Sequence, residues 1–472
     1  MKRAFGAVSL ALLLTACVSS PATKPQNAKI AAGALGLGAA LTPRIDHAWW
    51  KALGDPKLDE LIEQAFQGNP DLNAALARVR GAQSQLAASV AATFPQVTFD
   101  GAVQRERLSK DYIIPPPFAG TTRWIGTLQA NLSYSLDLFG REQDQIHRAQ
   151  ASADAAAFDA EAARLLLAGA VTQAYIALSR AWALSDAADE AVRQREGVLK
   201  LAAERVKAGL DTLASQRQAE ALLALAREDR IRTKAARDIA VHQIAALIGR
   251  GADAYDIPRP AIDKDALALP ARLPADLLAR RADIASAEAR VKAALSGREI
   301  ARKAFYPDVN LIALAGAAAI GLGPLFSSEA GQYGGGAAIH LPIFDAGKLR
   351  AQYAGATADL DEAIADYNGA VVNAVRQVSD SITDLNAISG EATQQRAARN
   401  AAQQSFDLAA ERYRSGLNPL QTVLDAEAVL IQTERDDAAL SADAASARVS
   451  LLMALGGGFD ASGANSKDEG HE

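Results

Sequence analysis

The sequence predicts an α+β membrane protein in which long helices are joined to a few β-strands and the whole unit occurs twice. Three observations support this fold class. The 472-residue chain is 50% hydrophobic but only 5% aromatic, which favours closely packed, alanine-rich helices over one large mixed core. Long stretches without proline alternate with short segments of period-two hydrophobicity. The same order of segments then recurs at a nearly constant offset, as it does in an internal repeat.

The first residues have the features of a secretory signal. Two cationic residues, Lys2 and Arg3, precede an apolar run that is followed by small residues. We therefore expect residues 1–16 to be a signal peptide that is removed from the mature chain.

The one cysteine of the chain, Cys17, follows this signal directly. Residues 14–17, Leu-Thr-Ala-Cys, resemble the bacterial lipobox, in which the thiol is acylated and the cysteine becomes the new N-terminus. Val18 stands where an inner-membrane retention signal would place Asp, so the resemblance implies the outer membrane. The alternative is a signal peptide with an incidental cysteine. Residues 17–48, which include the glycine-rich stretch 33–38, are predicted to be a flexible tether from the lipid.

After the signal, no run reaches the roughly 18 to 20 apolar residues that a transmembrane helix needs. A membrane-spanning part of the mature chain would therefore be a β-barrel, because helices and closed barrels are the two structures that satisfy every backbone group in lipid.

The chain contains two copies of one unit. Four residues of the first copy recur 212 positions later. They are Asp71, Arg78, Val79 and Pro95, which match Asp283, Arg290, Val291 and Pro307 in that order. From Gly140 onward the offset is 207, and the repeated segments are 140 with 347, 201–205 with 408–412, 209–210 with 416–417, 219–221 with 426–428, and 249 with 456. We assign residues 49–256 to the first repeat and 281–456 to the second, with a linker at 257–280 and a flexible tail at 457–472.

Each copy reads as a helix, two strands and two long helices. In the first copy we expect one helix from Pro56 to Ala92 with a kink near Pro70, because proline removes a helical hydrogen bond. Alternating residues predict strands at about 96–104 and 123–138, and the absence of breakers predicts helices at about 140–207 and 211–249. The second copy is expected to have an initial helix, strands at about 307–315 and 331–343, and helices at about 347–414 and 418–456.

Four strands per chain are too few to close a membrane barrel, which needs about eight or more. Two chains would supply eight strands and three would supply twelve, so the strand count predicts an oligomer. Aromatic residues, which are scarce overall, gather beside the strands and suit interfacial girdles; the alternative is packing in a soluble core. These aromatic residues are Phe94, Tyr112, Phe118, Trp124, Tyr134, Phe139, Phe305, Tyr306, Phe326, Tyr333 and Phe344.

Enzyme chemistry and nucleic-acid binding find no support. The net charge of -6 carries no basic surplus, which argues against a nucleic-acid partner. The five histidines are scattered without metal-ligand spacing, and the sequence contains no HExxH, phosphate-loop or serine-elbow motif. We therefore predict a protein that is not an enzyme, with no catalytic residues, no metal and no cofactor.

Two phrases of the second copy carry a family resemblance. They are residues 411–417, Glu-Arg-Tyr-Arg-Ser-Gly-Leu, and residues 342–347, Pro-Ile-Phe-Asp-Ala-Gly. Together with the lipobox and the duplicated element order, they resemble the TolC-type outer membrane factors, in particular the NodT-like lipoprotein branch of multidrug efflux. The resemblance covers about residues 49–456.

The resemblance implies a homotrimer in the cell outer membrane, with a twelve-stranded β-barrel and an α-helical barrel that extends into the periplasm. It also implies a periplasmic adaptor (membrane fusion protein) and an inner-membrane efflux pump as partners. The function implied is passive conduction of small molecules such as drugs.

Two helix-helix turns match the periplasmic tips of the family, where the adaptor docks. These turns contain Gly209-Leu210 and Gly416-Leu417. Glycine at the end of a helix permits the left-handed backbone that reverses the chain, and a bare turn glycine is the alternative interpretation.

Two residues near the second turn match gating positions of the family. Tyr413 matches a tyrosine that helps to hold the aperture shut, and Asp425 matches an acidic residue that lines it. A ring of three Asp425 side chains would favour cations, although an isolated Asp425 would be an ordinary solvated carboxylate. Thr422 and Ser215 stand where some relatives have further aspartates.

Two alternatives stay open at this stage. One is an outer-membrane duct for protein or polysaccharide export, and the other is a periplasmic coiled-coil adaptor or scaffold lipoprotein. The duplication and the alternating strands argue against the adaptor. The sequence does not identify the cargo, the pump or the adaptor.

Overall fold

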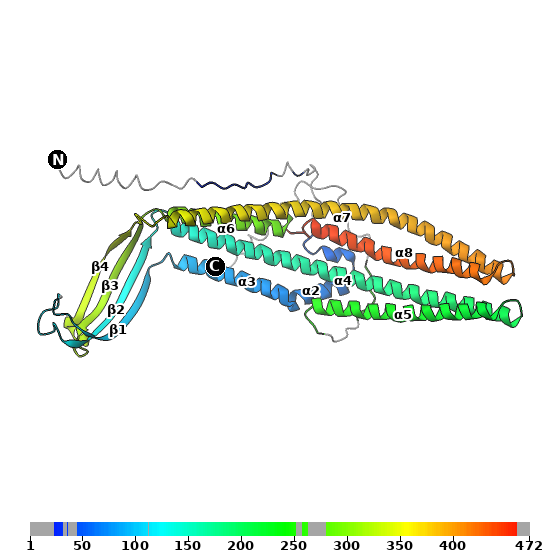
Figure 1. Ribbon diagram of the computed structural model, residues 1–472, viewed down its shortest axis with the longest axis horizontal. Helices are drawn as coiled ribbons and strands as arrows, with labels where there is room; N and C mark the ends of the chain where they lie inside the picture. Colours follow the sequence, from blue (N-terminus) through cyan, green and yellow to red (C-terminus); the bar gives the residue numbers. More distant parts are fainter. Residues whose placement is uncertain are drawn as a thin grey trace. The chain divides into compact units, whose positions relative to one another are not determined.

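The computed structural model describes residues 23–31, 35, 45–111, 113–251, 257–262 and 280–459. Cys17, Tyr112, His471 and the predicted signal peptide lie outside the described residues, as do parts of the predicted tether, linker and tail. Figure 1 shows the helices and strands. The chain divides into two compact units. Unit 1 comprises Met1–Lys29, Arg78–Ala156 and Ala287–Tyr367, and unit 2 comprises Ile30–Ala77, Ala157–Ser286 and Asn368–Glu472.

Unit 1 contains a single antiparallel sheet with the strand order β1-β2-β3-β4. The strands are β1 (Gln96–Arg107), β2 (Thr122–Leu136), β3 (Asp308–Ile320) and β4 (Gly331–His340). The two hairpins, one from each copy, join through β2 and β3, where Ala130 lies opposite Ala315. This pairing merges two distant parts of the chain into one sheet whose edges are β1 and β4.

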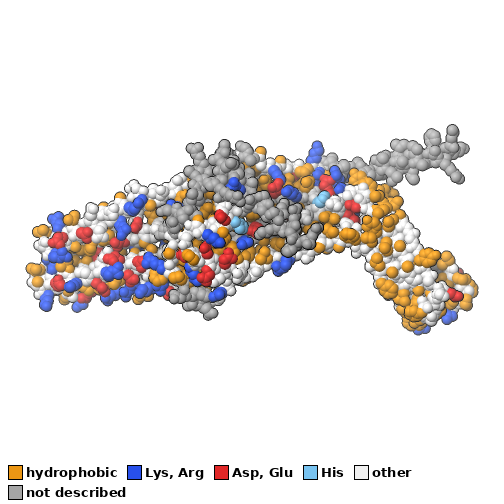
Figure 2. All heavy atoms as spheres, turned by 180° about the vertical axis from the view of Figure 1, so that it is seen from behind, with side chains coloured by type: hydrophobic (Ala, Val, Ile, Leu, Met, Phe, Trp, Pro, Cys, Tyr) orange, Lys and Arg blue, Asp and Glu red, His pale blue; other side chains and the backbone are white. Residues whose placement is uncertain are grey.

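The register separates an apolar face of the sheet from a polar one. Val97 lies opposite Leu132, which lies opposite Ala313, so these three side chains share a face. On the other face Asn131 donates a hydrogen bond to Asp100 at 2.6 Å. Large apolar side chains of β1 are exposed, with Val97 at 68% and Phe99 at 71%. Hydrophobic side chains accordingly cover much of the visible surface of the strands, whereas charged side chains gather on the helices (Figure 2).

Three helices of the first copy have counterparts of equal length in the described part of the second. The pairs are α3 (Pro70–Ala91) and α6 (Ala282–Lys303), 22 residues each; α4 (Arg141–Lys207) and α7 (Lys348–Arg414), 67 each; and α5 (Leu213–Leu247) and α8 (Leu420–Ala454), 35 each. At about 1.5 Å per residue, α4 and α7 are each roughly 100 Å long. The predicted two-fold internal repeat of long helices and four strands is confirmed.

The single kinked helix expected from Pro56 to Ala92 was a wrong prediction, because the structure has two helices there. They are α2 (Pro56–Gly68) and α3, and Asn69 separates them. The Asn69 carboxamide oxygen accepts hydrogen bonds from the backbone N–H groups of Asp71 and Leu72 at 2.9 and 3.1 Å. Pro70 then occupies the first helical position, where a missing N–H group costs nothing. The Asn-Pro pair therefore starts a new helix.

Helix α4 contains one 18-residue stretch that is apolar enough to cross a membrane by length and composition, and 56% of this stretch is buried inside the protein. A helix packed on several sides needs apolar residues around most of its circumference. Core packing therefore accounts for this stretch.

The core of unit 2 lies where four helices and the short 3-10 helix η2 (Trp49–Leu53) meet. Leu58 and Ile62 of α2 pack with Tyr175 of α4, Ile244 of α5 and Val449 of α8 in one buried cluster. This cluster contains residues from both repeats, so the hydrophobic effect holds helices of the two copies together within unit 2.

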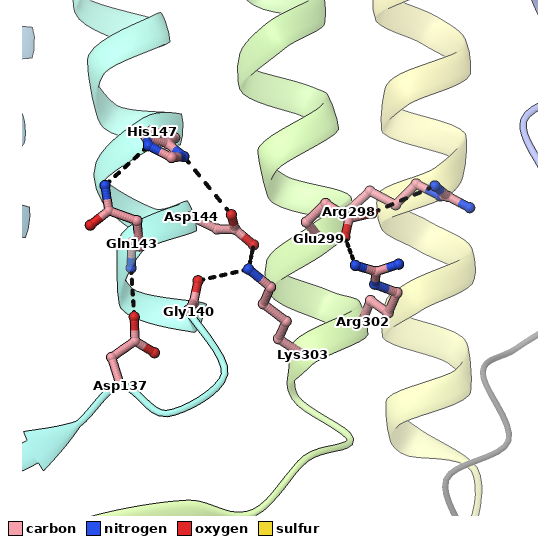
Figure 3. A network of polar contacts seen from close by, with 9 residues as sticks. All are labelled: Asp137, Gly140, Gln143, Asp144, His147, Arg298, Glu299, Arg302 and Lys303. Carbon is pink, nitrogen blue, oxygen red and sulfur yellow. Dashed lines mark hydrogen bonds and ion pairs between the residues drawn. The ribbon is translucent and has the colours of Figure 1, made fainter.

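Polar contacts hold the start of α4 in unit 1 (Figure 3). Lys303, at the end of α6, pairs with Asp144 at 2.6 Å and donates to the carbonyl oxygen of Gly140 at 2.9 Å. Gly140 has φ of 72°, and the Asp137 carboxylate accepts from the Gln143 N–H at 3.0 Å. These contacts fix the turn between β2 and α4.

Part of the predicted tether is bound to unit 1. The Asp361 carboxylate of α7 accepts hydrogen bonds from the backbone N–H groups of Gln26 and Asn27 at 2.8 and 2.9 Å. Lys29 pairs with Glu288 of α6 at 3.0 Å. Residues 26–29 are therefore bound to helices α6 and α7, and this part of the expected flexible tether is held in place.

Candidate functional site

The candidate site lies in unit 2, at the turns that close the hairpins α4–α5 and α7–α8. Gly209 and Gly416 occupy the left-handed region, with φ of 72° and 78°. In the first turn, the Leu210 N–H group donates to the Arg205 carbonyl oxygen at 2.9 Å. In the second turn, the Leu417 N–H group donates to the Arg412 carbonyl oxygen at 2.8 Å. These bonds form the same helix-ending motif in both copies.

The motif exposes one leucine on each turn. Leu210 is 65% exposed and Leu417 is 68% exposed. The four residues Gly209, Leu210, Gly416 and Leu417 therefore form two matching tips, each with an apolar side chain in solvent.

Tyr413 does not lie on the surface of the tip, because its side chain is buried between the hairpins. Its hydroxyl donates a hydrogen bond to Asp211 at 2.5 Å, and the Arg205 guanidinium lies 4.7 Å from the ring centre. Burial, followed by the hydrogen bond to Asp211 and the negative charge of that carboxylate, raises the pKa of the Tyr413 hydroxyl. Tyr413 is therefore a neutral donor.

Asp211 is the acceptor at the centre of these contacts. Its carboxylate also accepts from the Ser215 hydroxyl and the Thr212 N–H, both at 2.7 Å. Burial opposes ionisation, but the hydrogen bonds from Tyr413, Ser215 and Thr212 and the charge of Arg205 lower the pKa of Asp211 below its usual range. Asp211 is thus ionised at neutral pH.

Arg205 connects the two turns. One guanidinium nitrogen donates to the Tyr413 carbonyl oxygen at 2.9 Å, and another donates to the Leu210 carbonyl oxygen at 3.3 Å. We call Arg205, Asp211 and Tyr413 the tip lock, because together they join the α4–α5 turn to the end of α7.

An apolar cluster packs beside the tip lock. Helices from both hairpins contribute to it: Val198, Ala202, Ala219, Ala409, Leu420, Val423 and Leu424 are buried together with Tyr413. Separating the hairpins would expose this cluster to water, which costs about 25 cal/mol of free energy for each Å² of apolar surface exposed.

Asp425 lies on the exposed side of α8 and has other partners. It accepts a hydrogen bond from Gln421 at 2.7 Å, and Gln421 accepts one from Gln218 of α5 at 3.1 Å. The structure thus groups Tyr413 with Arg205 and Asp211, and Asp425 with the two glutamines. Thr422 is exposed, while Ser215 supports the tip lock.

The sequence interpretation missed Arg205 and Asp211. A signal for Arg205 was present, because it ends the segment 201–205 that recurs at 408–412. Asp211 follows the first tip directly, but its equivalent in the second copy is Asn418. A comparison of the two copies therefore gave no reason to single out Asp211.

Among the described residues, no group of three or more His, Cys, Asp or Glu side chains is placed to bind a metal. Cys17, the predicted lipidation site, lies outside them.

Comparisons with known proteins agree with this architecture. The profile of the family Outer membrane efflux protein matches residues 61–250 and 273–457. The pyoverdine export outer membrane protein OpmQ of Pseudomonas aeruginosa is 30% identical over 465 residues, covering 96% of each chain. The fusaric acid resistance protein FusA of Burkholderia cepacia is 37% identical over 369 residues, covering 75% of this chain and 69% of that protein.

Among solved structures, the outer membrane protein VceC from Vibrio cholerae superimposes with a TM-score of 0.82 at 32% identity. The match covers 88% of this chain and 100% of VceC. The outer-membrane channel OprN superimposes with a TM-score of 0.81 at 26% identity, covering 93% of this chain and 99% of that one.

Members of this family form trimeric outer membrane channels within tripartite efflux systems, with helices that extend into the periplasm. The two profile matches fall on the two repeats. The chain therefore belongs to the outer membrane efflux protein family, and it is an efflux channel of the TolC type rather than an enzyme.

Proposed function

We propose that three copies of this chain form a lipid-anchored channel whose paired tips receive a periplasmic adaptor, which links the channel to an inner-membrane pump. The observation that carries this proposal is the pair of matching turns, each with a left-handed glycine and an exposed leucine, joined by the tip lock. An adaptor could bind both turns through similar contacts. Release of the tip lock would then free the hairpins to separate.

The sheet supports the homotrimer. Strands β1 and β4 are its edges, and their outward backbone groups need partners in lipid. Twelve strands from three chains would pair every edge, and the apolar face of each sheet would then contact the bilayer.

The names of relatives support a small-molecule cargo. They refer to pyoverdine export and to fusaric acid resistance. We propose that this channel conducts small organic molecules delivered by its pump. Export of protein or polysaccharide is the alternative, which growth assays with candidate toxins and secretion assays would distinguish.

Gly416→Arg tests the docking proposal. We expect loss of most drug resistance, with normal trimer levels in the outer membrane, because the arginine would obstruct an adaptor that binds beside the exposed Leu417. A residue other than glycine costs about 1–2 kcal/mol at such a φ. Gly416→Ala carries this strain without the bulk, and its added Cβ would meet no atom closer than Arg205 at 3.9 Å. Gly416→Ala should therefore keep most resistance. Full resistance in Gly416→Arg would rule out docking at this turn.

Cys17→Ser tests the lipid anchor. Acylation requires the thiol, so we expect the variant to incorporate no labelled fatty acid and to retain its signal peptide. Each buried CH₂ of an acyl chain contributes about 0.8 kcal/mol to membrane affinity. Labelling of the unsubstituted chain and the variant is compared after growth with a fatty-acid analogue. Equal incorporation in the two proteins would exclude Cys17 as the acylated residue.

A further inference from the structure

Two arginines lie at one end of the apolar face of the sheet. Arg105 and Arg107 follow Val103 at alternate positions of β1, so their side chains leave the strand on the face that carries Val97 and Phe99. The register of β1 with β2 is unbroken over the whole of β1. Both arginines are exposed. An apolar surface thus ends in two cationic side chains.

An aromatic ring lies beside the first of these arginines. Trp124 of β2 is directly opposite Arg105, and the guanidinium carbon of Arg105 lies 5.8 Å from the ring centre. Trp124 is 45% exposed, so its ring lies open on the same face. Tryptophan beside an exposed cation suits a membrane interface, where the ring covers apolar surface and its N–H group meets polar groups.

The charge on this face has one sign. Among the described residues of the four strands, Arg105 and Arg107 are the only charged residues on the apolar face. Glu106 lies between them in sequence but faces the other way, opposite Arg123. Neither Arg105 nor Arg107 forms an ion pair within the described part of the chain. An anion from outside the chain would therefore complement this end of the face.

The two arginines lie at the level expected for lipid headgroups. Strand β1 follows α3 and β2 leads into α4, so the β1–β2 turn lies at the end of the sheet away from these helices. Figure 2 shows basic side chains at that tip of the sheet. At an ordinary rise and a tilt of about 40°, the stretch of β2 from Leu136 to Trp124 spans a height of roughly 30 Å.

The apolar band of a membrane barrel is about 25 Å tall. If the apolar residues near Leu136 lie at one boundary of this band, Trp124 and Arg105 lie just beyond the other. The helices of the family extend into the periplasm, so this second boundary belongs to the outer leaflet.

We propose that Arg105, Arg107 and Trp124 bind the phosphate groups of anionic lipids in the outer leaflet. A guanidinium group can donate two parallel hydrogen bonds to phosphate oxygens. Its apolar stem lies along the apolar face while the charged end stays at the headgroup level. The inference rests on the proposed barrel, because the apolar face of the sheet meets lipid in the assembled trimer.

Arg123 provides a matched control at the same end of the sheet. It lies on the polar face, where its guanidinium carbon is 5.9 Å from the centre of the Phe118 ring. It also donates a hydrogen bond to the Thr121 hydroxyl at 3.3 Å. Loss of this cation changes the net charge of the hairpin but not the charge of the apolar face.

The first test measures lipid binding to the purified trimer by native mass spectrometry. Lipid A is the diphosphorylated probe, and phosphatidylethanolamine is the lipid without net charge. Lipid A should bind at least about tenfold more tightly. Each basic residue near an anionic surface contributes roughly a fivefold gain in affinity, so Arg105→Gln/Arg107→Gln should weaken lipid A binding roughly 30-fold. Arg123→Gln should leave it nearly unchanged. An excess of inorganic phosphate should not displace lipid A, because the acyl chains also contact the apolar face.

Three results of this test would overturn the proposal. They are equal lipid A binding by the double variant and the unsubstituted trimer, an equal loss in Arg123→Gln, and displacement of lipid A by inorganic phosphate. The same spectra report the mass of the assembly. A monomer would overturn the proposed channel together with this inference, whereas a trimer that does not prefer lipid A would overturn this inference alone.

The second test measures the depth of Trp124 in proteoliposomes. Lipids brominated near the headgroup should quench part of the tryptophan fluorescence more strongly than lipids brominated near the chain ends. This difference should disappear in Trp124→Phe, because Trp49 and Trp50 are buried within the protein. Stronger quenching from the chain ends, or the same quenching pattern in Trp124→Phe, would show that Trp124 does not lie at the headgroup level and would overturn the proposal.

Discussion

Gly249→Ala and Gly456→Ala are each expected to prevent accumulation of the folded trimer. These glycines end α5 and α8 at equivalent places in the two repeats, with φ of 73° and 100°. A Cβ at Gly249 would lie 2.0 Å from the Gly68 carbonyl oxygen, and one at Gly456 would lie 1.8 Å from the Arg280 carbonyl oxygen. Both obstacles are backbone atoms, so a rotamer change cannot relieve them.

The expected cost is at least about 3 kcal/mol, from overpacking together with the left-handed backbone. Thermal unfolding and trimer yield from outer membranes measure the effect. Gly54→Ala is the matched control in unit 2, because Gly54 has φ of 72° but nothing within 4 Å of the added Cβ. It should cost about 1 kcal/mol and leave the yield nearly normal. Equal stability of the Gly249 and Gly54 variants would contradict the close approach of the Gly68 carbonyl oxygen to Gly249.

Tyr413→Phe is expected to open the resting channel. The substitution removes the hydrogen bond to the ionised Asp211 and keeps the ring beside Arg205. A hydrogen bond to a charged group contributes about 1.5–3 kcal/mol, so the open-to-closed ratio of each protomer should rise about tenfold or more. The measurement is resting conductance in planar bilayers, supported by sensitivity of cells to large antibiotics.

Two controls separate the tip lock from general effects. Tyr353→Phe, at a buried tyrosine of the same helix in unit 1, should leave resting conductance unchanged. Asp425→Ala should also leave the channel closed, but should reduce its preference for cations if three Asp425 carboxylates line the aperture. Unchanged conductance in Tyr413→Phe would show that the lock does not hold the aperture, and unchanged selectivity in Asp425→Ala would remove that residue from it.

The repeat was the strongest guide to the fold. Constant offsets of 212 and 207 predicted two copies with equal helices, and the paired helices have 22, 67 and 35 residues. Each offset stays constant over a stretch of helices because a helix of one copy must match the equivalent helix of the other in length. Loops tolerate insertions, so the offset changes there. The break at Asn69 was predicted only as a kink, because proline within a helical pattern is compatible with either outcome.

The sequence by itself determined the element order, the duplication, the alternating strands and the two tip glycines. All of these depend on local periodicity or on residues with special backbone freedom. Only the tertiary structure decided the pairing of β2 with β3 and the partners of Tyr413. Each brings together residues from different repeats, and Arg205 and Tyr413 are 208 positions apart. Their contacts arise from packing between the copies, and a repeat records the similarity of two copies but not the contacts between them.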